Sequence, residues 1–487
     1  MLEVVRGARR RSAEGRASRG RARALGALIT AAMVTLVVPA PASSQDVQPD
    51  TLRLSLDDAM RLAEGGNPGF RQADNAVGLN SVESRATWLS ELVPQVSVQL
   101  FNTNFTGNLQ RRAVDNFGNP IENPTADWNY FSRTTQALNL SWSFQGRSLF
   151  DTHRRQALVN RDRDLARGAA LSELQIEVQR RYIDALEQRE LMQAEEDLIV
   201  ARRVDQDVAS RLFSLAIRTR VDVLNAELAV EQQSLAHRRQ QGAFERALLA
   251  LRTTLGADGP EALDLEPEPL PIFDPSGLDT DALVRRALDA NPALRRADVA
   301  VRQASVGVAE QRNTWWPQVS MGFDLVRRAQ QPSDGALFDV SFDEDLDRAF
   351  FLQLSLPVFN GFFENRRDAQ RADVELDNRR EADREARLGV EESVRGSRLE
   401  LTNQWETLRL AERSLEIAEE ALRLAREEYR LGARSFEDLR ASFDQEAETR
   451  RQVIAARYAF VDALLDLEEA VGEPVRPVAN GPAGPER

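Results

Sequence analysis

Two uninterrupted helical stretches of unusual length constrain this chain more than any other sequence feature. Residues 147–213 and 362–430 contain no proline, and their apolar residues recur every three or four positions. At 1.5 Å per residue each stretch would form a helix of about 100 Å, several times the usual globular length. Leu and Ala alternate at the inward positions, which indicates closely packed coiled-coil neighbours. Two shorter predicted helices, 68–92 and 222–254, together cover about 88 Å, so one long helix can lie beside two stacked shorter ones.

The chain contains this layout twice. Four short segments of its first half recur in the second half in the same order, which indicates an internal duplication. The matching segments are Asn67-Pro68 and Asn291-Pro292, Val93-Pro94-Gln95-Val96-Ser97 and Trp316-Pro317-Gln318-Val319-Ser320, Leu140-Ser141-Trp142-Ser143-Phe144-Gln145-Gly146 and Leu354-Ser355-Leu356-Pro357-Val358-Phe359-Asn360-Gly361, and Phe213 to Asp222 and Tyr429 to Asp438.

The duplication predicts the domain boundaries. We expect a first repeat over residues 52–255 and a second over 278–472, each with helices, two strands and a long coiled-coil helix pair. Residues 256–277 between them are rich in Pro, Asp and Glu, which is typical of a linker. Residues 473–487 are predicted to form a disordered C-terminal tail.

Residues 1–42 have the features of a secretory signal peptide. Eight Arg against two Glu precede an apolar run at 25–40, and Ala40-Pro41-Ala42 is a small-x-small cleavage site. A membrane anchor is the alternative, but this apolar run falls short of the roughly 20 residues that span a bilayer. We therefore expect an exported protein.

Each half also contains two stretches in which apolar and polar residues alternate. After Pro94 and Pro317 the period of the apolar pattern changes from 3.6 to 2, which predicts strands with one apolar face. We expect four strands of about 8–12 residues, joined by polar loops near 103–132 and 326–349. The apolar positions are Val96, Val98 and Leu100; Leu138, Leu140 and Trp142; Val319, Met321, Phe323 and Leu325; and Leu352, Leu354, Leu356 and Val358.

The composition argues against most catalytic classes. The 487 residues include no cysteine and only two histidines, His153 and His237, which are far apart. Disulfides, thiolate metal sites and a lipid-anchoring cysteine are thereby excluded, and a histidine-based triad or metal centre is disfavoured. A net charge of −14 argues against a nucleic-acid binder. The carboxylates lie among arginines at helical spacing, which is typical of a solvated helix face. We expect no enzyme, no cofactor and no metal.

Four amphipathic strands in an exported chain indicate the outer membrane. Open sheet edges cannot face hydrocarbon, and about eight strands are the practical minimum for a closed barrel. The barrel must therefore be shared among subunits. Trp88, Trp142, Trp315 and Trp316 lie at strand ends, where an interfacial aromatic belt is expected, with packing at helix–strand junctions as the alternative.

With these features, residues 52–472 resemble the TolC-like outer membrane factors. The resemblance is carried by Asn-Pro opening the second helix, Pro before the first strand, Phe-x-Gly before the long helix, and the turn pattern aromatic-x-x-Gly-x-x-Ser/Thr-x-x-Asp. It implies a mainly α protein with a small β part: a periplasmic α-barrel of long antiparallel helices, and four strands per chain in a shared transmembrane β-barrel of a homotrimer.

The resemblance also implies a function. Such a channel is the exit duct of a tripartite efflux or type I secretion system, in contact with outer membrane lipid, a periplasmic adaptor protein and an inner-membrane transporter. The sequence does not specify the substrate or the class of transporter. An exported periplasmic coiled-coil scaffold is the alternative.

The resemblance assigns roles to the turns between helices, residues 214–221 and 431–437. We expect an adaptor-docking surface there, a polar latch that closes the periplasmic mouth, and an acidic ring in the lumen; solvent-exposed turns and ordinary surface charges are the alternatives. The docking candidates are Arg218, Thr219, Arg220, Gly432, Ala433 and Ser435, the latch candidates are Asp222, Tyr429 and Arg434, and the ring candidates are Asp438 and Glu437.

The chain departs from the family pattern in two places. Ala216 stands where the second turn keeps Gly432, and Trp142-Ser143-Phe144 lacks the proline that Pro357 supplies in the second repeat. The first departure bears on the adaptor contact of the first turn, and the second on the local geometry of the strand.

Overall fold

A computed structural model describes residues 51–114, 117–257, 262–332, 346–356 and 361–475. The predicted signal peptide, Pro357 and most of the predicted C-terminal tail lie outside these residues. All elements described below belong to the unit that begins at Thr51.

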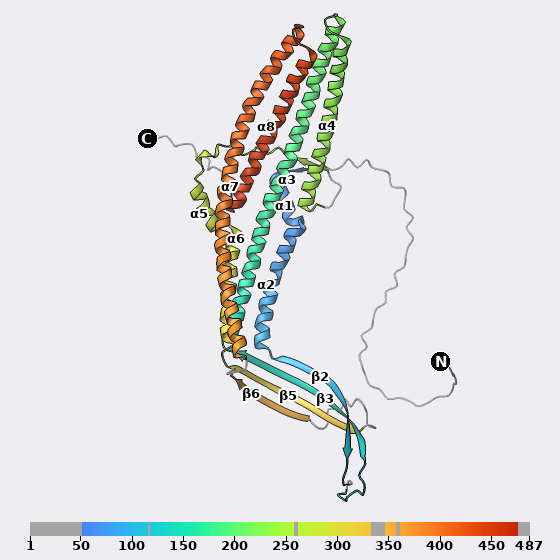
Figure 1. The fold of residues 1–487 in the computed structure, drawn as a ribbon, viewed down its shortest axis with the longest axis vertical. Coiled ribbons are helices and arrows are strands. Elements are labelled where there is room, and N and C mark those ends of the chain that lie inside the picture. Colours follow the sequence, from blue (N-terminus) through green and yellow to red (C-terminus); the bar gives the residue numbers. More distant parts are fainter. Residues whose placement is uncertain (1–50, 115–116, 258–261, 333–345, 357–360, 476–487) are drawn as a thin grey trace, which may run out of the picture. The chain divides into compact units, whose positions relative to one another are not determined.

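The same series of elements occurs twice along the chain (Figure 1). Each series has a short helix, a second helix, two strands, a very long helix and a final helix of 36 residues. The first is α1 (Leu56–Gly66), α2 (Pro68–Leu92), β2 (Gln95–Arg111), β3 (Ala126–Gln145), α3 (Ser148–Ser214) and α4 (Arg220–Leu255). The second is α5 (Thr280–Ala290), α6 (Pro292–Asn313), β5 (Gln318–Pro332), β6 (Leu346–Ser355), α7 (Phe362–Arg430) and α8 (Phe436–Val471).

The two long helices have the predicted length and position. α3 has 67 residues and α7 has 69, and each packs along shorter helices: α3 against α2 and α4, and α7 against α6 and α8. The inward Leu and Ala positions are in part confirmed, since Leu408, Leu422 and Ala425 are buried. Long helices lying beside stacked shorter ones agree with the prediction.

Asn67 joins α2 and α4 end to end. Its Oδ1 accepts a hydrogen bond from the backbone N–H of Phe70 at 3.0 Å, so it caps α2 as predicted. Its Nδ2 donates to the carbonyl of Thr254 in the last turn of α4 at 2.8 Å. α4 ends at Gly256, where φ is +64° and a Cβ would lie 2.3 Å from the carbonyl oxygen of Gly66. Only glycine fits this junction.

The second repeat builds the same junction with Asn291. Its Oδ1 accepts from the N–H of Ala293 at 2.9 Å, and its Nδ2 donates to the carbonyl of Ala470 at 3.1 Å. α8 ends at Gly472, again with a left-handed φ of +80°. The Asn-Pro motif therefore caps one short helix and ties it to the C-terminal end of another.

The four long strands form one antiparallel sheet in the order β2-β3-β5-β6. Their lengths are 17, 20, 15 and 10 residues, so the predicted loops over 103–132 and 326–349 were wrong at both ends, where residues 103–111, 126–132, 326–332 and 346–349 form strands. Residues 115–116 and 333–345 of these loops lie outside the described residues. The polar residues from Asn102 to Arg111 continue the ladder by pairing with Thr135 to Ala126. The ladder joins backbone groups, and it continues through polar side chains where a partner strand is present.

The register places the paired apolar positions predicted in the four strands on one face of the sheet; Leu356 lies beyond the end of β6, and Val358 lies outside the described residues. Residues directly opposite each other share a face, and one such row runs from Val96 through Leu140 and Phe323 to Phe350. The adjacent row on the other face contains Ser97, Asn139, Asp324 and Ala349. The sheet therefore has one apolar and one mainly polar face.

A β-bulge in β2 keeps the apolar residues of the second half of this strand on the same face of the sheet as those of its first half. The register shifts between Gln99 and Asn102, so β2 contributes one residue more than β3 there. The shift reverses which side chains point to which face. As a result Phe105 and Leu109 share a face with Val96 and Val98 although their numbers differ in parity.

Part of the predicted linker is ordered. β4 (Ala262–Leu265) pairs in parallel with β1 (Thr51–Leu54), and a 3-10 turn, η1, follows at Pro275–Gly277. The hydroxyl of Tyr182 on α3 lies 2.9 Å from the carbonyl oxygen of Leu54 and 2.7 Å from that of Glu266. The start of the predicted tail is also fixed, because Val475 is buried.

Candidate functional site

Two tight turns lie between the paired helices, within the predicted ranges. Residues 215–219 join α3 to α4, and residues 431–435 join α7 to α8. Both turns begin with the same hydrogen bond across the helix end, from the N–H of Ile217 to Leu212 and from the N–H of Ala433 to Glu428, each at 2.9 Å. The residue before the donor is left-handed in each, with φ of +56° at Ala216 and +80° at Gly432. Ala216 thus adopts the conformation of the glycine it replaces.

The two predicted aspartates both cap the helix that follows their turn. The carboxylate of Asp222 accepts from the N–H of Thr219 at 3.0 Å, and the Thr219 hydroxyl accepts from the N–H of Asp222, which makes a capping box. In the second turn the Ser435 hydroxyl donates to the carboxylate of Asp438 at 2.6 Å. This hydrogen bond holds the pKa of Asp438 below its usual value. Both ends therefore carry an acidic group at a helix N-terminus, where the helix dipole favours it.

Arg218 connects the two turns of one chain. Its guanidinium donates to the backbone carbonyl of Tyr429 at 3.1 Å and also bonds to the carbonyl of Arg434. Its Cζ lies 4.4 Å from the centre of the Tyr429 ring, within the range of a cation–π contact. The sequence predicted Arg218 as a docking residue, whereas in the structure it holds the second turn.

The three predicted latch residues lie in this region without bonding to one another in the described part of the single chain. Tyr429 is 1% exposed, its hydroxyl has no hydrogen-bond partner among the described residues, and burial raises the pKa of that hydroxyl. Arg434 pairs with Glu428 at 3.4 Å, and Asp222 bonds to Thr219. A latch would therefore need rearrangement or another copy of the chain.

The turns also carry exposed apolar side chains that sequence reasoning missed. Leu215, Ile217 and Val221 are exposed in the first, and Leu431 is 83% exposed in the second. Together with the predicted docking residues Thr219, Arg220, Ala433 and Ser435, which are also exposed, they form a mixed polar and apolar surface. Clustered exposed apolar residues are typical of interaction sites.

Behind the turns, buried charges join the two helical hairpins. Asp205 on α3, which interrupts the apolar heptads, accepts hydrogen bonds from Arg426 on α7 at 3.2 and 3.4 Å. Arg202 bonds to Asp444 on α8, and its Cζ lies 3.5 Å from the centre of the Phe443 ring. Burial raises the pKa of Asp205 and lowers that of Arg202. The only sequence signal for this cluster was the acidic residue within an apolar stripe.

At the other end of the helices the apolar face of the sheet is open. Val98 on β2 and Phe350, Leu352 and Leu354 on β6 are each more than 60% exposed. The apolar run of β5 from Val319 to Leu325 covers about 20 Å along the strand, close to the height of the apolar band of a transmembrane barrel. Among the described residues, no helix is long and apolar enough to cross a membrane.

The predicted aromatic residues gather where the helices meet the sheet. Trp88 stacks on His153 with ring centres 3.8 Å apart, and the Trp142 indole donates to the carbonyl of Leu92 at 3.2 Å. Trp88 and Trp316 nevertheless remain more than half exposed. Packing at helix–strand junctions is thus confirmed for Trp88 and Trp142, and the interfacial aromatic belt stays a prediction.

Comparison with known proteins shows a similarity to one family. Residues 283–473, from α5 to the end of α8, match the family described as outer membrane efflux protein. The match covers less than half of the chain. The predicted resemblance to TolC-like outer membrane factors is thereby confirmed, and the family is one of outer membrane efflux proteins rather than of enzymes, as expected.

Individual relatives agree with this assignment. Protein CyaE of Bordetella pertussis (strain Tohama I) is 28% identical over 259 residues, which are 50% of this chain and 52%, or about half, of CyaE. The CmeC outer membrane channel of Campylobacter jejuni has 16% identity and a TM-score of 0.65, over 86% of this chain and 85% of CmeC. The MtrE outer membrane channel of Neisseria gonorrhoeae, in its open state, has 18% identity and a TM-score of 0.63, over 86% of this chain and 89% of MtrE. The predicted mainly α fold with a small β part is confirmed, and it is similar to the fold of these channels.

Proposed function

We propose that this chain forms the outer membrane exit duct of an efflux or secretion system and that it works as a homotrimer. The observation that carries the proposal is the four-stranded sheet with one exposed apolar face, one mainly polar face and, among the described residues, no strand paired to the outer edge of β2 or β6. In lipid such edges must be paired, and four strands are too few to close on themselves. Three copies would supply twelve strands, with the apolar face toward lipid and the polar face around an aqueous path.

The helices support the same assembly. On the sheet side α2 packs on α3, α3 on α6 and α6 on α7; on the turn side α4 packs on α3, α3 on α8 and α8 on α7. α7 therefore lies at one edge of each helical layer, and α2 and α4 lie at the other. Head-to-tail association of α7 with the opposite edge of the next copy would close a ring.

Exposed apolar residues mark the two edges on the turn side. α7 carries Leu410, Ile417, Leu424 and Leu431 at intervals of seven residues, which is the repeat of a coiled-coil seam. α4 carries a second stripe with spacings of three, four and seven. Its members are Val221, Leu224, Leu228 and Leu235. Apolar stripes on opposite edges are what head-to-tail packing of identical copies needs.

We propose the exposed turns as the docking surface for a periplasmic adaptor, which would link the duct to an inner-membrane transporter. The apolar residues Leu215 and Ile217 support this role, since they are 68% and 53% exposed. The docking residues remain those predicted from the sequence: Arg218, Thr219, Arg220, Gly432, Ala433 and Ser435.

The latch and the acidic ring also remain proposals. Asp222, Tyr429 and Arg434 would hold the mouth closed through contacts with the neighbouring copy, and the unpaired buried hydroxyl of Tyr429 is available for one of them. Asp438, with Glu437 beside it, would place a ring of negative charge at the mouth. The lowered pKa of Asp438 supports this role because its carboxylate stays charged at neutral pH.

Reconstitution tests the proposed function. The mature chain, purified in detergent, is expected to run as a trimer and to give single-channel conductance in planar bilayers. It should also resist a high-salt wash of the membrane pellet, whereas a periplasmic scaffold would be released. A monomer that conducts no current while keeping its helical circular dichroism would contradict the proposal.

A further inference from the structure

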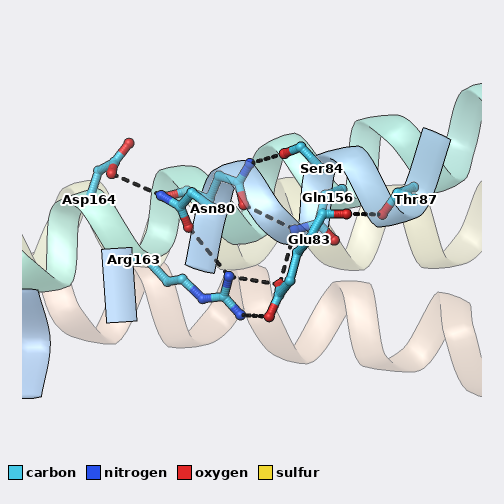
Figure 2. A network of polar contacts seen from close by, with 8 residues as sticks. Asn80, Glu83, Ser84, Thr87, Gln156, Arg163 and Asp164 are labelled. Carbon is cyan, nitrogen blue, oxygen red and sulfur yellow. Dashed lines mark hydrogen bonds and ion pairs between the residues drawn. The ribbon is translucent and has the colours of Figure 1, made fainter. Parts of the chain in front are cut away.

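Over residues 79–89, α2 turns a polar face toward α3 and leaves an apolar face exposed, while Phe70 near its start is buried in the core. Toward α3 it presents Asn80, Glu83 and Ser84 (Figure 2). The exposed face carries Leu79, Val82, Ala86 and Leu89. We name the last four residues the α2 stripe. Leu79, Val82 and Leu89 are 49%, 61% and 58% exposed, and their spacing with Ala86 is three, four and three, as in a coiled-coil seam. A surface helix usually packs its apolar face against its own chain and exposes its polar face, and this part of α2 does the opposite.

The polar face is fully engaged by α3. Arg163 makes two hydrogen bonds to the carboxylate of Glu83, at 2.7 and 2.9 Å, and a third to Asn80 at 3.3 Å. Gln156 donates to Glu83 at 3.2 Å (Figure 2). The remaining contacts are Asn160 to Ser84 at 2.8 Å, Asn80 to Asp164 at 3.1 Å and Gln156 to Asn160 at 3.0 Å. We name this set the α2–α3 network.

The α2–α3 network fixes how α2 is rotated about its axis. At 100° per residue the network residues of α2 are centred about 130° from the α2 stripe. Turning the stripe toward α3 would separate Arg163 from Glu83 and place apolar side chains against Gln156 and Asn160. Removing one partner from a partly buried, bidentate ion pair is costly, while the intact pair adds little stability, so its main effect is on orientation.

The covering partner follows from chain connectivity. α2 runs directly into β2, at one edge of the sheet, and α7 follows β6, at the other edge. If β6 of one copy pairs with β2 of the next, the first half of α7 must lie beside the neighbour's α2. This step rests on the trimer proposed above.

The exposed apolar residues at the start of α7 lie at about the same distance from the sheet, measured along the helix, as the α2 stripe. Phe363 and Val374 are 83% and 58% exposed, and their separation of eleven residues places them on the same face of α7. Counted from the sheet at 1.5 Å per residue, Phe363 lies at about 2 Å and Val374 at about 18 Å. Leu89 lies at about 5 Å, and Val82 and Leu79 at about 15 and 20 Å. Two antiparallel helices would thus bring Phe363 to Leu89 and place Val374 between Val82 and Leu79.

We infer that the α2–α3 network orients α2 so that its apolar stripe is kept for α7 of the neighbouring copy. The network residues are positioning residues, and the occupant of the stripe is a second copy of this chain. A polar contact within the chain and an apolar contact between chains ensure that α2 buries its stripe only on assembly.

Disulfide trapping tests the contact, because the chain contains no cysteine of its own. Val82→Cys combined with Val374→Cys should give covalent dimers and trimers on oxidation in the membrane. Ser81→Cys with Val374→Cys is the matched control, since Ser81 is exposed on α2 but about 100° away from Val82. Equal crosslinking in the two pairs, or crosslinking within one chain, would overturn the inference.

A second variant tests the network. In the Val82→Cys and Val374→Cys background, Glu83→Leu with Arg163→Leu should lower crosslinking between chains about tenfold, the factor that corresponds to 1.4 kcal/mol of orientational preference. Removal of the exposed pair on α6 by Asp298→Leu with Arg302→Leu changes charge equally and should leave the yield unaltered.

The remaining outcomes are equally decisive. If the double leucine variant does not reach the membrane, the single change Glu83→Gln should still lower the yield, and an unchanged yield in either variant would refute the orienting role. Trimer mass and conductance, measured on the same cysteine variants, distinguish a failure of the inference from a failure of the proposed function. A conducting trimer without the Val82–Val374 crosslink would contradict only the inference, while the absence of a trimer would contradict the proposed function itself.

Discussion

Replacement of Asn67 should loosen the junction between α2 and α4, and the size of the effect can be worked out from its two hydrogen bonds. Asn67→Ala removes the cap on Phe70, which costs about 1 kcal/mol, and the bond to the Thr254 carbonyl, which costs about another 1 kcal/mol. Local opening of the last turn of α4, which loses only the second bond, should therefore become about fivefold more frequent, as 1.4 kcal/mol corresponds to a factor of ten.

Hydrogen exchange measured by mass spectrometry on the detergent-solubilised protein reads this opening directly. Asn67→Asp is the informative comparison, because a carboxylate still caps α2 but cannot donate to the carbonyl of Thr254. At neutral pH its exchange should match that of Asn67→Ala in the last turn of α4 and that of the parent chain in the first turn of α2. Exchange in α4 should slow when the Asp is protonated and regains a donor. Asn291→Ala is the matched control and should affect α8 but not α4.

The reasoning would be refuted if either Asn67→Ala or Asn67→Asp left the last turn of α4 as protected at neutral pH as in the parent chain. Either result would mean that the amide does not hold the two helices together. The second junction, at Asn291, would then need another explanation as well.

Three further changes probe the turns and the middle of α3. Ala216→Gly should stabilise the first turn by about 1 kcal/mol, seen as slower hydrogen exchange, because alanine there has a φ of +56°. Burial, with nearby acidic groups, raises the pKa of Glu187 to about 7, so folding takes up a proton and the stability of the folded chain rises as pH falls from about 7 to 4.5. Glu187→Gln should remove this dependence of stability on pH. Measured by thermal unfolding at pH 8, it should also add about 1 kcal/mol of stability, after allowance for the partial exposure of the side chain. Asp222→Ala with Arg434→Ser should raise bilayer conductance, and Asp438→Asn should lower cation selectivity; unchanged currents would exclude the latch and the ring respectively.

Helix boundaries could be predicted from the sequence because their signals are local. Asn-Pro at a helix start and Gly just after a helix end act through neighbouring backbone groups, and proline-free runs with regular apolar spacing specify α3 and α7. The alternation of Val96, Val98 and Leu100 likewise revealed which face of the sheet is apolar.

Features that depend on distant partners were missed. The outer part of β3 has no apolar alternation of its own, and it forms a strand because β2 and β5 lie on either side of it. β4 has four residues and exists through its pairing with β1. The contact of Arg218 with the second turn joins residues more than 200 positions apart, and local sequence carries no signal for it.

The number and order of strands in the assembled protein test the central claim most directly. A cryo-electron microscopy map of the mature chain in lipid nanodiscs should show three copies around one axis and a closed barrel of twelve strands. In that barrel β6 of each copy should pair with β2 of the next, and α7 should lie against the neighbour's α2 and α4. A monomer, or a dimer joined by two equivalent β2 edges, would contradict the account.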